Sequence, residues 1–165
     1  MKIFFYINTI SSGGAERVLT NLATEMSVRG HKCTIVTSFP CRLRKLLVLE
    51  KPDILVSFMA EPNFRATIAK MGTGVKSIFS VRSSPHIEYR GKLAFFLAKT
   101  LFRFGNSAVF QTNDAKNWFP QAIRKKSVII YNPIGEIFYN TRLNEVRTGI
   151  VTVGRLKHLQ KLQIR

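Results

Sequence analysis

The sequence has 165 residues, of which 45% are hydrophobic, so it is long enough for one domain with its own core and is not a disordered tail. Lysine and arginine number 26 against 9 acidic residues, and the formal charge of +17 predicts an anionic partner: nucleic acid, an acidic membrane face or a phosphorylated substrate. Cys33 and Cys41 form neither a CxxC pair nor a metal-ligand spacing, which is typical of a reduced, cytoplasmic protein. No apolar run approaches the ~18 residues of a membrane span, and the N-terminal run is too short for a signal peptide.

Apolar runs rich in β-branched and aromatic residues alternate with helical patterns along the chain. We expect strands at residues 3–7, 33–39, 53–59, 75–81, 107–112 and 127–132. We expect helices at 15–28, near 42–50, 62–71, 90–104 and 113–122. The strand runs are almost continuously apolar, as in strands that are covered on both faces. The alternation therefore predicts an α/β fold, a Rossmann-like doubly wound parallel sheet.

The chain changes character after the last of these strands. We expect the Rossmann-like domain to span 1–138, a polar, turn-rich linker to span 139–148, and a further unit to begin at 149–165. The run "GIVTV" at 149–153 resembles a strand, and a lone strand cannot bury its apolar faces. It therefore joins the first sheet, pairs with a second copy in a homodimer, or begins a second domain.

The stretch "SSGGAERV" at 11–18 places two glycines where the first strand turns into the first helix. Gly13 and Gly14 present no side chain, and the helix start that follows offers unpaired N–H groups to an anionic group. The alternative is a tight turn that needs glycine conformations. Glu16, in the first helical turn, is expected to stabilise the helix dipole.

Ligands of doubly wound sheets bind at the carboxyl ends of the strands. Gly13, Gly14, Arg82 and His86 all follow predicted strands and should lie on one rim. Arg82 is a candidate to contact an acceptor or a phosphate, with a solvated surface arginine as the alternative. His86 is the one imidazole expected on that rim and a candidate for acid–base chemistry or acceptor hydrogen bonding.

The segment "YRGKLAFFLAKTLFRFG" at 89–105 combines a helical apolar stripe with four cations. The stripe is formed by Leu93, Phe96, Leu97, Leu101 and Phe104. One interpretation is a core helix with a solvated basic face. The other is contact with an anionic membrane.

Seven segments of the sequence, in order along almost the whole chain, carry a family resemblance. They are "GGAERV", "NLATEMSVRGHKCTIVTSF", "KPDILVSFM", "SVRSSP", "VFQTNDAKNWF", "VIIYNPI" and "IVTVGRL…QK". The chain resembles family-4 glycosyltransferases of the bacterial polysaccharide type. The resemblance implies the N-terminal half of a GT-B architecture, in which two Rossmann-like domains face a cleft.

The same resemblance implies an activity. Such enzymes transfer a sugar from a nucleotide-sugar to an acceptor, usually with retention and without a metal or other cofactor. The first domain mainly holds the acceptor, and the matching positions Arg155 and Lys161 would clamp the donor diphosphate. No D-x-D motif is present to hold a metal, and no residue is assigned as catalytic.

The sequence also departs from the family pattern. Most of the donor-binding domain, with its E-x7-E pattern, has no counterpart, and the segment between Phe39 and Lys51 is shorter than usual. A sheet edge should be exposed there.

The resulting hypothesis is a partial glycosyltransferase that uses a nucleotide-sugar donor and a cell-surface polysaccharide or lipid-linked acceptor. It would be cytoplasmic and peripheral on the inner face of the membrane. The alternative is a basic, non-catalytic module for nucleic acid, an anionic membrane or a partner subunit. Nucleic acid is disfavoured because helix-turn-helix, RNP-type and zinc patterns are absent.

Overall fold

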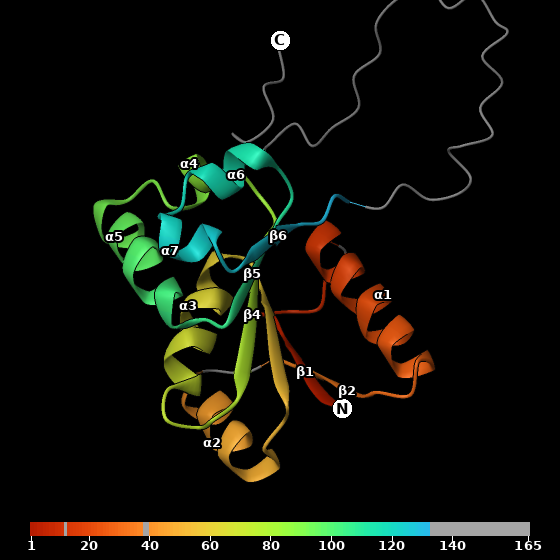
Figure 1. Cartoon of the computed structure of the whole chain (residues 1–165). Coiled ribbons are helices and arrows are strands. Elements are labelled where there is room, and N and C mark those ends of the chain that lie inside the picture. Colours follow the sequence, from red (N-terminus) through yellow and green to blue (C-terminus); the bar gives the residue numbers. More distant parts are fainter. Residues whose placement is uncertain (12, 38–39, 133–165) are drawn as a thin grey trace, which may run out of the picture. The chain divides into compact units, whose positions relative to one another are not determined.

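The computed structural model describes residues 1–11, 13–37 and 40–132. These residues form a six-stranded, fully parallel sheet in the order β2-β1-β3-β4-β5-β6 (Figure 1). The strands are β1 Lys2–Tyr6, β2 Lys32–Val36, β3 Ile54–Phe58, β4 Lys76–Val81, β5 Ser107–Phe110 and β6 Ser127–Ile129. The helices are α1 Gly14–Val28, α2 Pro40–Glu50, α3 Ala60–Lys70, α4 Pro85–Glu88, α5 Lys92–Leu101, the 3₁₀ turn η1 Phe102–Phe104, α6 Asn113–Asn117 and α7 Gln121–Arg124. The Rossmann-like α/β prediction is confirmed.

The helices divide unequally between the two faces of the sheet. The connection from β1 to β2 runs one way along the sheet, and every later connection runs the other way. Because crossovers between parallel strands are right-handed, α1 covers one face and the later helices cover the opposite face. Figure 1 shows α1 on one side of the sheet and α2, α3, α5 and α7 on the other.

Alternating residues of the central strands point to opposite faces of the sheet and belong to two separate core layers. The layer under α1 contains Ile3, Phe5, Ile7, Leu19, Ala23, Val56 and Phe58. The layer under α2 and α3 contains Phe4, Tyr6, Val36, Leu43, Leu47, Leu55, Ala66, Ala69 and Val75. The nearly continuous apolar runs in the sequence thus reflect strands buried on both faces.

A third cluster, rich in aromatic rings, lies under α5, α6 and α7. It contains Phe79, Val81, Tyr89, Ala98, Phe102, Ala108, Phe110, Ala115, Phe119 and Ile123. Phe79 and Phe102 have ring centroids 4.4 Å apart, and Gly105 leaves room for the Phe79 ring, which a Cβ there would approach to 2.9 Å. Such contacts hold η1 and β5 against β4.

Two predicted helices differ in their extent. The expected helix at 113–122 is two short helices, α6 and α7, because Pro120 has extended backbone angles and starts a new helix. The expected helix at 90–104 ends as the 3₁₀ turn η1, and α4 interrupts the loop before it.

Strand β2 lies at one edge of the described sheet, where it pairs with β1. The chain passes from β2 through α2 directly to β3, and Lys32 and Thr34 of β2 are exposed. This arrangement agrees with the edge expected from the short segment between Phe39 and Lys51. A lysine on an edge strand discourages uncontrolled pairing with other strands.

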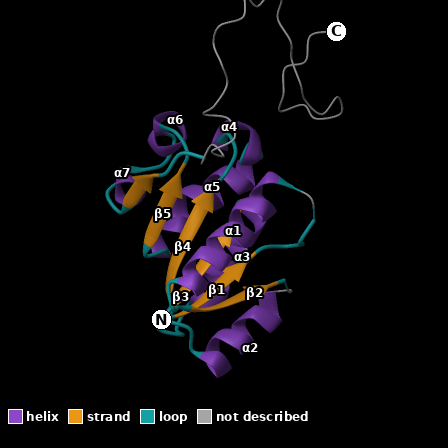
Figure 2. Cartoon of the chain, turned by 90° about the vertical axis from the view of Figure 1, so that its right-hand side faces the viewer, coloured by secondary structure: helices purple, strands orange, loops and turns teal. Residues whose placement is uncertain are grey.

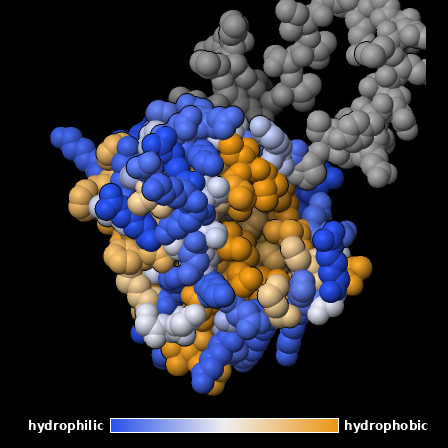
Figure 3. Space-filling view, in the orientation of Figure 1, coloured by the Kyte–Doolittle hydropathy of each residue, from blue (hydrophilic) through white to orange (hydrophobic). Residues whose placement is uncertain are grey.

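The α1 face of β4, β5 and β6 has no described helix over it (Figure 2). Figure 3 shows apolar side chains gathered beside α1, and Val128 and Ile130 are exposed. Residues Met1–Tyr131 form one compact unit of the chain. The expected linker at 139–148 and the strand at 149–153 lie outside the described residues.

Candidate substrate-binding rim

The carboxyl ends of β1 and β3 form the topological switch point of the sheet. These two strands are neighbours, and the connections that follow them leave in opposite directions. Ligands of open α/β sheets bind in the crevice outside such a point. Asn8 follows β1, and Met59 follows β3, so both lie at this crevice beside the loop that leads to Gly13.

Neither glycine of the first loop has a conformation that only glycine adopts. Gly13 is the N-cap of α1 with φ −91° and ψ 164°, and Gly14 is the first helical residue. The described glycines with positive φ are Gly30, Gly72 and Gly74. The alternative that this turn needs glycine conformations is therefore wrong for Gly13 and Gly14, and what they provide is space.

The space at Gly13 is filled from within the chain. A Cβ added there would overlap the Glu16 carboxylate, which also accepts a hydrogen bond from Ser11 Oγ at 3.2 Å. A carboxylate at the start of a helix interacts favourably with the unpaired N–H groups and the dipole. A Cβ at Gly14 would meet no atom within 4 Å. The open approach to α1 is thus at Gly14.

A polar cluster that the sequence analysis did not identify lies between β1 and α3. Asn8 Nδ2 donates to Glu61 Oε2 at 2.6 Å, and Arg65 Nη1 donates to Asn8 Oδ1 at 3.1 Å. Arg65 also pairs with Glu61 one helical turn away. Burial raises the pKa of Tyr6, while its hydrogen bond with Arg65 acts in the opposite direction. The segment "EPNFR" carries the E-x-x-x-R spacing, but only the fold brings Asn8 to it.

The start of α3 is stabilised by a carboxylate from a distant segment. Met59, its N-cap, has φ 75°, a strained value for a residue with a side chain. Glu88 at the end of α4 accepts from the Ala60 N–H at 2.8 Å and from Ser83 Oγ at 2.6 Å. Glu88 therefore fixes the loop after β4 against the loop after β3.

Arg82 follows β4 directly and is partly buried. Its guanidinium carbon lies 5.7 Å from the centroid of the Phe58 ring at the end of β3. Burial lowers the pKa of Arg82, yet an arginine stays protonated at neutral pH. Arg82 is thus a cation held in place by packing at the rim.

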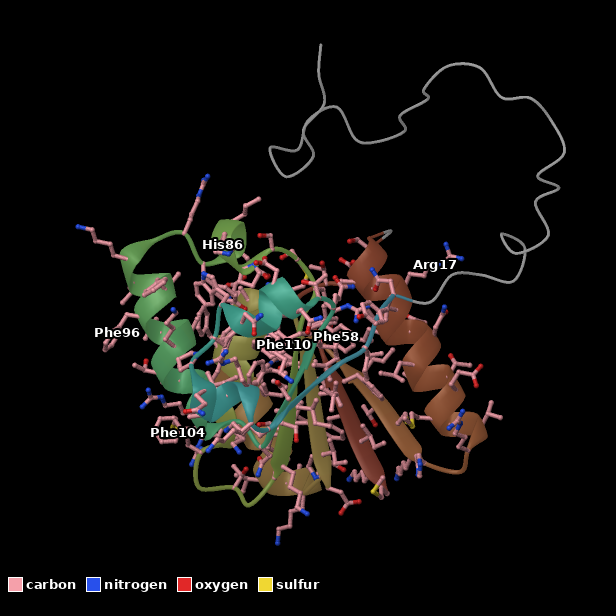
Figure 4. All side chains as sticks on the ribbon, turned by 45° about the horizontal axis from the view of Figure 1, so that its top comes forward. Arg17, Phe58, His86, Phe96, Phe104 and Phe110 are labelled. Atoms are coloured by element: carbon pink, nitrogen blue, oxygen red, sulfur yellow. The ribbon has the colours of Figure 1, made fainter. Side chains whose placement is uncertain are left out.

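His86 lies on α4 at the same edge, and Figure 4 shows it there together with Arg17 at the start of α1. Its Nε2 is 3.9 Å from Asp114 Oδ2, and its ring lies edge-on to Trp118 with centroids 6.3 Å apart. A cavity of about 400 Å³ adjoins it, lined by His86, Tyr89, Arg90, Lys92, Phe95 and Trp118. Lys99 Nζ lies 4.3 Å from the Phe95 ring centroid and 4.7 Å from that of Trp118. The cavity combines cations with aromatic rings, which suits an anionic or sugar-bearing group.

The interpretation of 89–105 as a core helix with a solvated basic face is wrong for part of the apolar stripe. Leu93, Phe96 and Phe104 are exposed. Within α5 and η1, the buried positions are Ala98 and Phe102 instead. The segment therefore packs against the core through Ala98 and Phe102, and its large apolar residues Leu93, Phe96 and Phe104 face outward.

The remaining expectations concern donor-phosphate binding, metal binding and membrane-spanning segments. Arg155 and Lys161 are outside the described residues. Over residues 1–11, 13–37 and 40–132, no group of three or more histidine, cysteine, aspartate or glutamate side chains is placed to hold a metal ion. In the same part of the chain, none of the helices has the length and apolar character needed to cross a bilayer.

No protein-family profile matches the chain. In sequence, it is 25% identical, over an alignment of 196 residues, to a Campylobacter jejuni enzyme named as an α-1,4-N-acetyl-D-galactosaminyltransferase acting on GalNAc-α-(1→4)-GalNAc-α-(1→3)-diNAcBac-PP-undecaprenol. This alignment covers 96% of the chain and 54% of the relative. The chain thus spans about half the length of that curated relative.

Solved structures show the same fold. HepE from Anabaena in complex with UDP matches with a TM-score of 0.66 and 16% identity over 84% of this chain and 46% of HepE. HepE with UDP and glucose matches at 0.62 and 17%, over 81% of this chain and 45% of HepE. The apo lipopolysaccharide outer core galactosyltransferase WaaB matches at 0.58 and 15%, over 81% of this chain and 46% of WaaB. Taken together, the sequence and structural relatives point to a glycosyltransferase.

Proposed function

We propose that the chain is part of a family-4 glycosyltransferase of GT-B architecture and that residues 1–138 are its acceptor-binding domain. The observation that carries this proposal is the alignment of 96% of the chain with an enzyme whose acceptor is a polyprenyl-diphosphate glycan. Its support in the structure is a parallel sheet whose switch-point rim is rich in cations and hydrogen-bonding groups. The reaction is transfer of a sugar from a nucleotide-sugar to a lipid-linked or polysaccharide acceptor.

The rim offers distinct groups to such an acceptor. Asn8, Glu61 and Arg65 present amide, carboxylate and guanidinium groups that can hydrogen-bond sugar hydroxyls. Arg82 supplies a fixed cation, and the open backbone at Gly14 lets a phosphate or sugar approach the start of α1. His86, which lines the cavity, is proposed to hydrogen-bond an acceptor hydroxyl.

The donor would be held by the other half of the cleft. Arg155 and Lys161 are proposed to contact the donor diphosphate, where two cations would stabilise the charge that accumulates on the leaving group. Residues 1–138 would then form the acceptor domain, 139–148 the linker, and 149–165 the start of the donor domain. The relative's 196-residue alignment exceeds the 165 residues of this chain, so that relative carries segments with no counterpart here. This supports an internally shortened member of the family.

The chain is proposed to act in the cytoplasm as a peripheral protein on the inner membrane face. A lipid-linked acceptor would place the reaction there, and the charge of +17 favours anionic lipids. Self-association is also proposed through the apolar residues 149–153, either with a second copy or with the chain's own sheet.

Titration of the ¹⁵N-labelled chain with a soluble, short-chain polyprenyl-diphosphate glycan tests the proposed function. We expect amide signals of Gly14, Arg82 and His86 to shift, and Arg82→Gln to weaken binding about 10-fold because it removes one charge-assisted hydrogen bond. Lys76→Gln is the matched control: it removes a charge at the opposite end of the same strand, β4. An absence of rim shifts, or equal weakening by both variants, would refute the assignment of an acceptor site.

A further inference from the structure

The outer surface of α5 and η1 is apolar where a solvated helix would be polar. Leu93 is 70% exposed, Phe96 62% and Phe104 58%. Figure 4 shows Phe96 and Phe104 directed away from the rest of the molecule, and Figure 3 shows apolar residues at this outer edge. The name α5–η1 face is used below for these three residues and the exposed cations Arg90, Lys92 and Arg103.

Helical geometry explains why these side chains gather on one side. At about 100° per residue, Leu93, Phe96 and Arg103 project within one sector of the helix, while Ala98 and Phe102 project toward the sheet. Ala98 is buried in the aromatic cluster, and the Phe102 ring stacks on the Phe64 ring of α3 with centroids 5.1 Å apart. The outer residues Leu93, Phe96 and Phe104 are therefore not part of the aromatic core cluster.

The charge around this face has one sign. Arg90, Lys92, Lys99 and Arg103 are the charged residues between Tyr89 and Asn113, a stretch without a carboxylate. In the described residues, the ion pairs involve other side chains. Lys99 rests on aromatic rings rather than on an acid. A partner that fits must therefore combine an apolar interior with an anionic surface.

We infer that the α5–η1 face docks on an anionic lipid bilayer, with α5 lying in the plane of the interface. Large apolar side chains inserted among headgroups, together with flanking lysine and arginine, form the usual combination of an interfacial helix. Lysine and arginine close to an anionic membrane surface add electrostatic attraction to this apolar contact. The choice of a lipid surface rests in part on the proposed function, whose acceptor is lipid-linked.

This placement also connects the bilayer with the rim. Arg90 and Lys92 belong to the α5–η1 face and also line the cavity that contains His86 and Trp118. A headgroup at the interface would therefore lie next to the candidate acceptor site. The docking face and the rim are continuous through α4 and the start of α5.

Vesicle co-sedimentation of the full chain tests the inference. We expect binding to phosphatidylglycerol–phosphatidylcholine vesicles to exceed binding to pure phosphatidylcholine and to weaken with salt. Two variants, F96S/F104S and K92Q/R103Q, should each weaken binding to the anionic vesicles about 10-fold or more. The controls are V28S, an exposed apolar residue of α1 that is 78% exposed, and R29Q at the end of the same helix.

Three outcomes would overturn the inference. The first is equal binding to both vesicle types, and the second is equal binding by F96S/F104S and V28S. The third is a change of oligomeric state: light scattering shows a dimer for the wild type and a monomer for F96S/F104S, while vesicle binding is the same for both. In that case the α5–η1 face would bind a second copy of the chain and not a bilayer. Since all substituted side chains are exposed, both double variants should have melting temperatures close to that of the wild type. If one variant fails to fold, the other still tests the inference.

The soluble-acceptor titration separates this inference from the proposed function. F96S/F104S should bind the short-chain acceptor as the wild type does. If vesicle binding is absent while the rim signals still shift, the docking face is wrong and the proposed function stands.

Discussion

At the residue scale, the structure reduces the number of roles that the two glycines of the first loop can have. "GGAER" is compatible with a conformational role or a steric one, and the backbone angles of Gly13 and Gly14 remove the first. The Glu16 carboxylate lies over Gly13. An anionic ligand at the helix start would compete with that carboxylate, so the free approach is one residue further on, at Gly14.

Tyr89 is a residue whose environment predicts a pH dependence. Burial, reinforced by the nearby Glu88 charge, raises the pKa of Tyr89 well above the ordinary value of 10.0. Above pH 10 the unfolded chain loses the phenolic proton and the folded chain keeps it, so the free energy of unfolding falls as pH rises.

We predict that Tyr89→Phe reduces this alkaline loss, by up to about 1.4 kcal/mol for each pH unit above 10. The ring stays, and with it the stacking on Trp118 at 5.5 Å. Urea unfolding at pH 8 and pH 11 measures the difference, with Tyr131→Phe, which removes an exposed phenol, as the control. Parallel pH curves for Tyr89→Phe and the wild type would contradict the prediction.

At the scale of the element, α3 begins at a strained residue and depends on a cap from another segment. Met59 cannot relax easily because β3 ends directly before it and Glu88 holds the Ala60 N–H after it. No local N-cap side chain bonds the start of α3. The long-range carboxylate therefore replaces the serine or aspartate that usually serves there.

We predict that Glu88→Ala lowers the free energy of unfolding by about 1–2 kcal/mol, because it removes a cap and a bond to Ser83. Glu25→Ala, an exposed carboxylate on α1, should change it by less than about 0.5 kcal/mol. Chemical denaturation compares the two variants. A loss for Glu88→Ala no larger than that for Glu25→Ala would show that the cap contributes little.

At the scale of the whole molecule, the chain matches less than half of each of the three solved structures compared above. The alignment with the curated relative likewise covers 54% of that relative. A sugar transfer between two facing domains needs both of them to surround the reacting groups.

We therefore predict that the 165-residue chain alone transfers no sugar in multiple turnovers. Mass spectrometry of an acceptor incubated with nucleotide-sugars and the chain provides the measurement. More than one sugar transferred per chain would overturn this prediction, while leaving the fold and the docking face untouched.

The sequence by itself determined the class of fold, because six apolar runs of strand length separated by helical patterns have one common solution, a parallel sheet with helices on both faces. It also identified Gly13, Gly14, Arg82 and His86 as residues that follow strands. The cluster of Asn8, Glu61 and Arg65 and the long-range cap by Glu88 required the tertiary structure, since their partners are distant in sequence.

The outward face of α5 likewise required the structure. Helical periodicity assigned Leu93, Phe96 and Phe104 to one stripe, but a stripe does not say which side of the helix the core occupies. The packing of Ala98 and Phe102 against the aromatic cluster decided that. Periodicity fixes which residues lie together, and only packing fixes which of them face water.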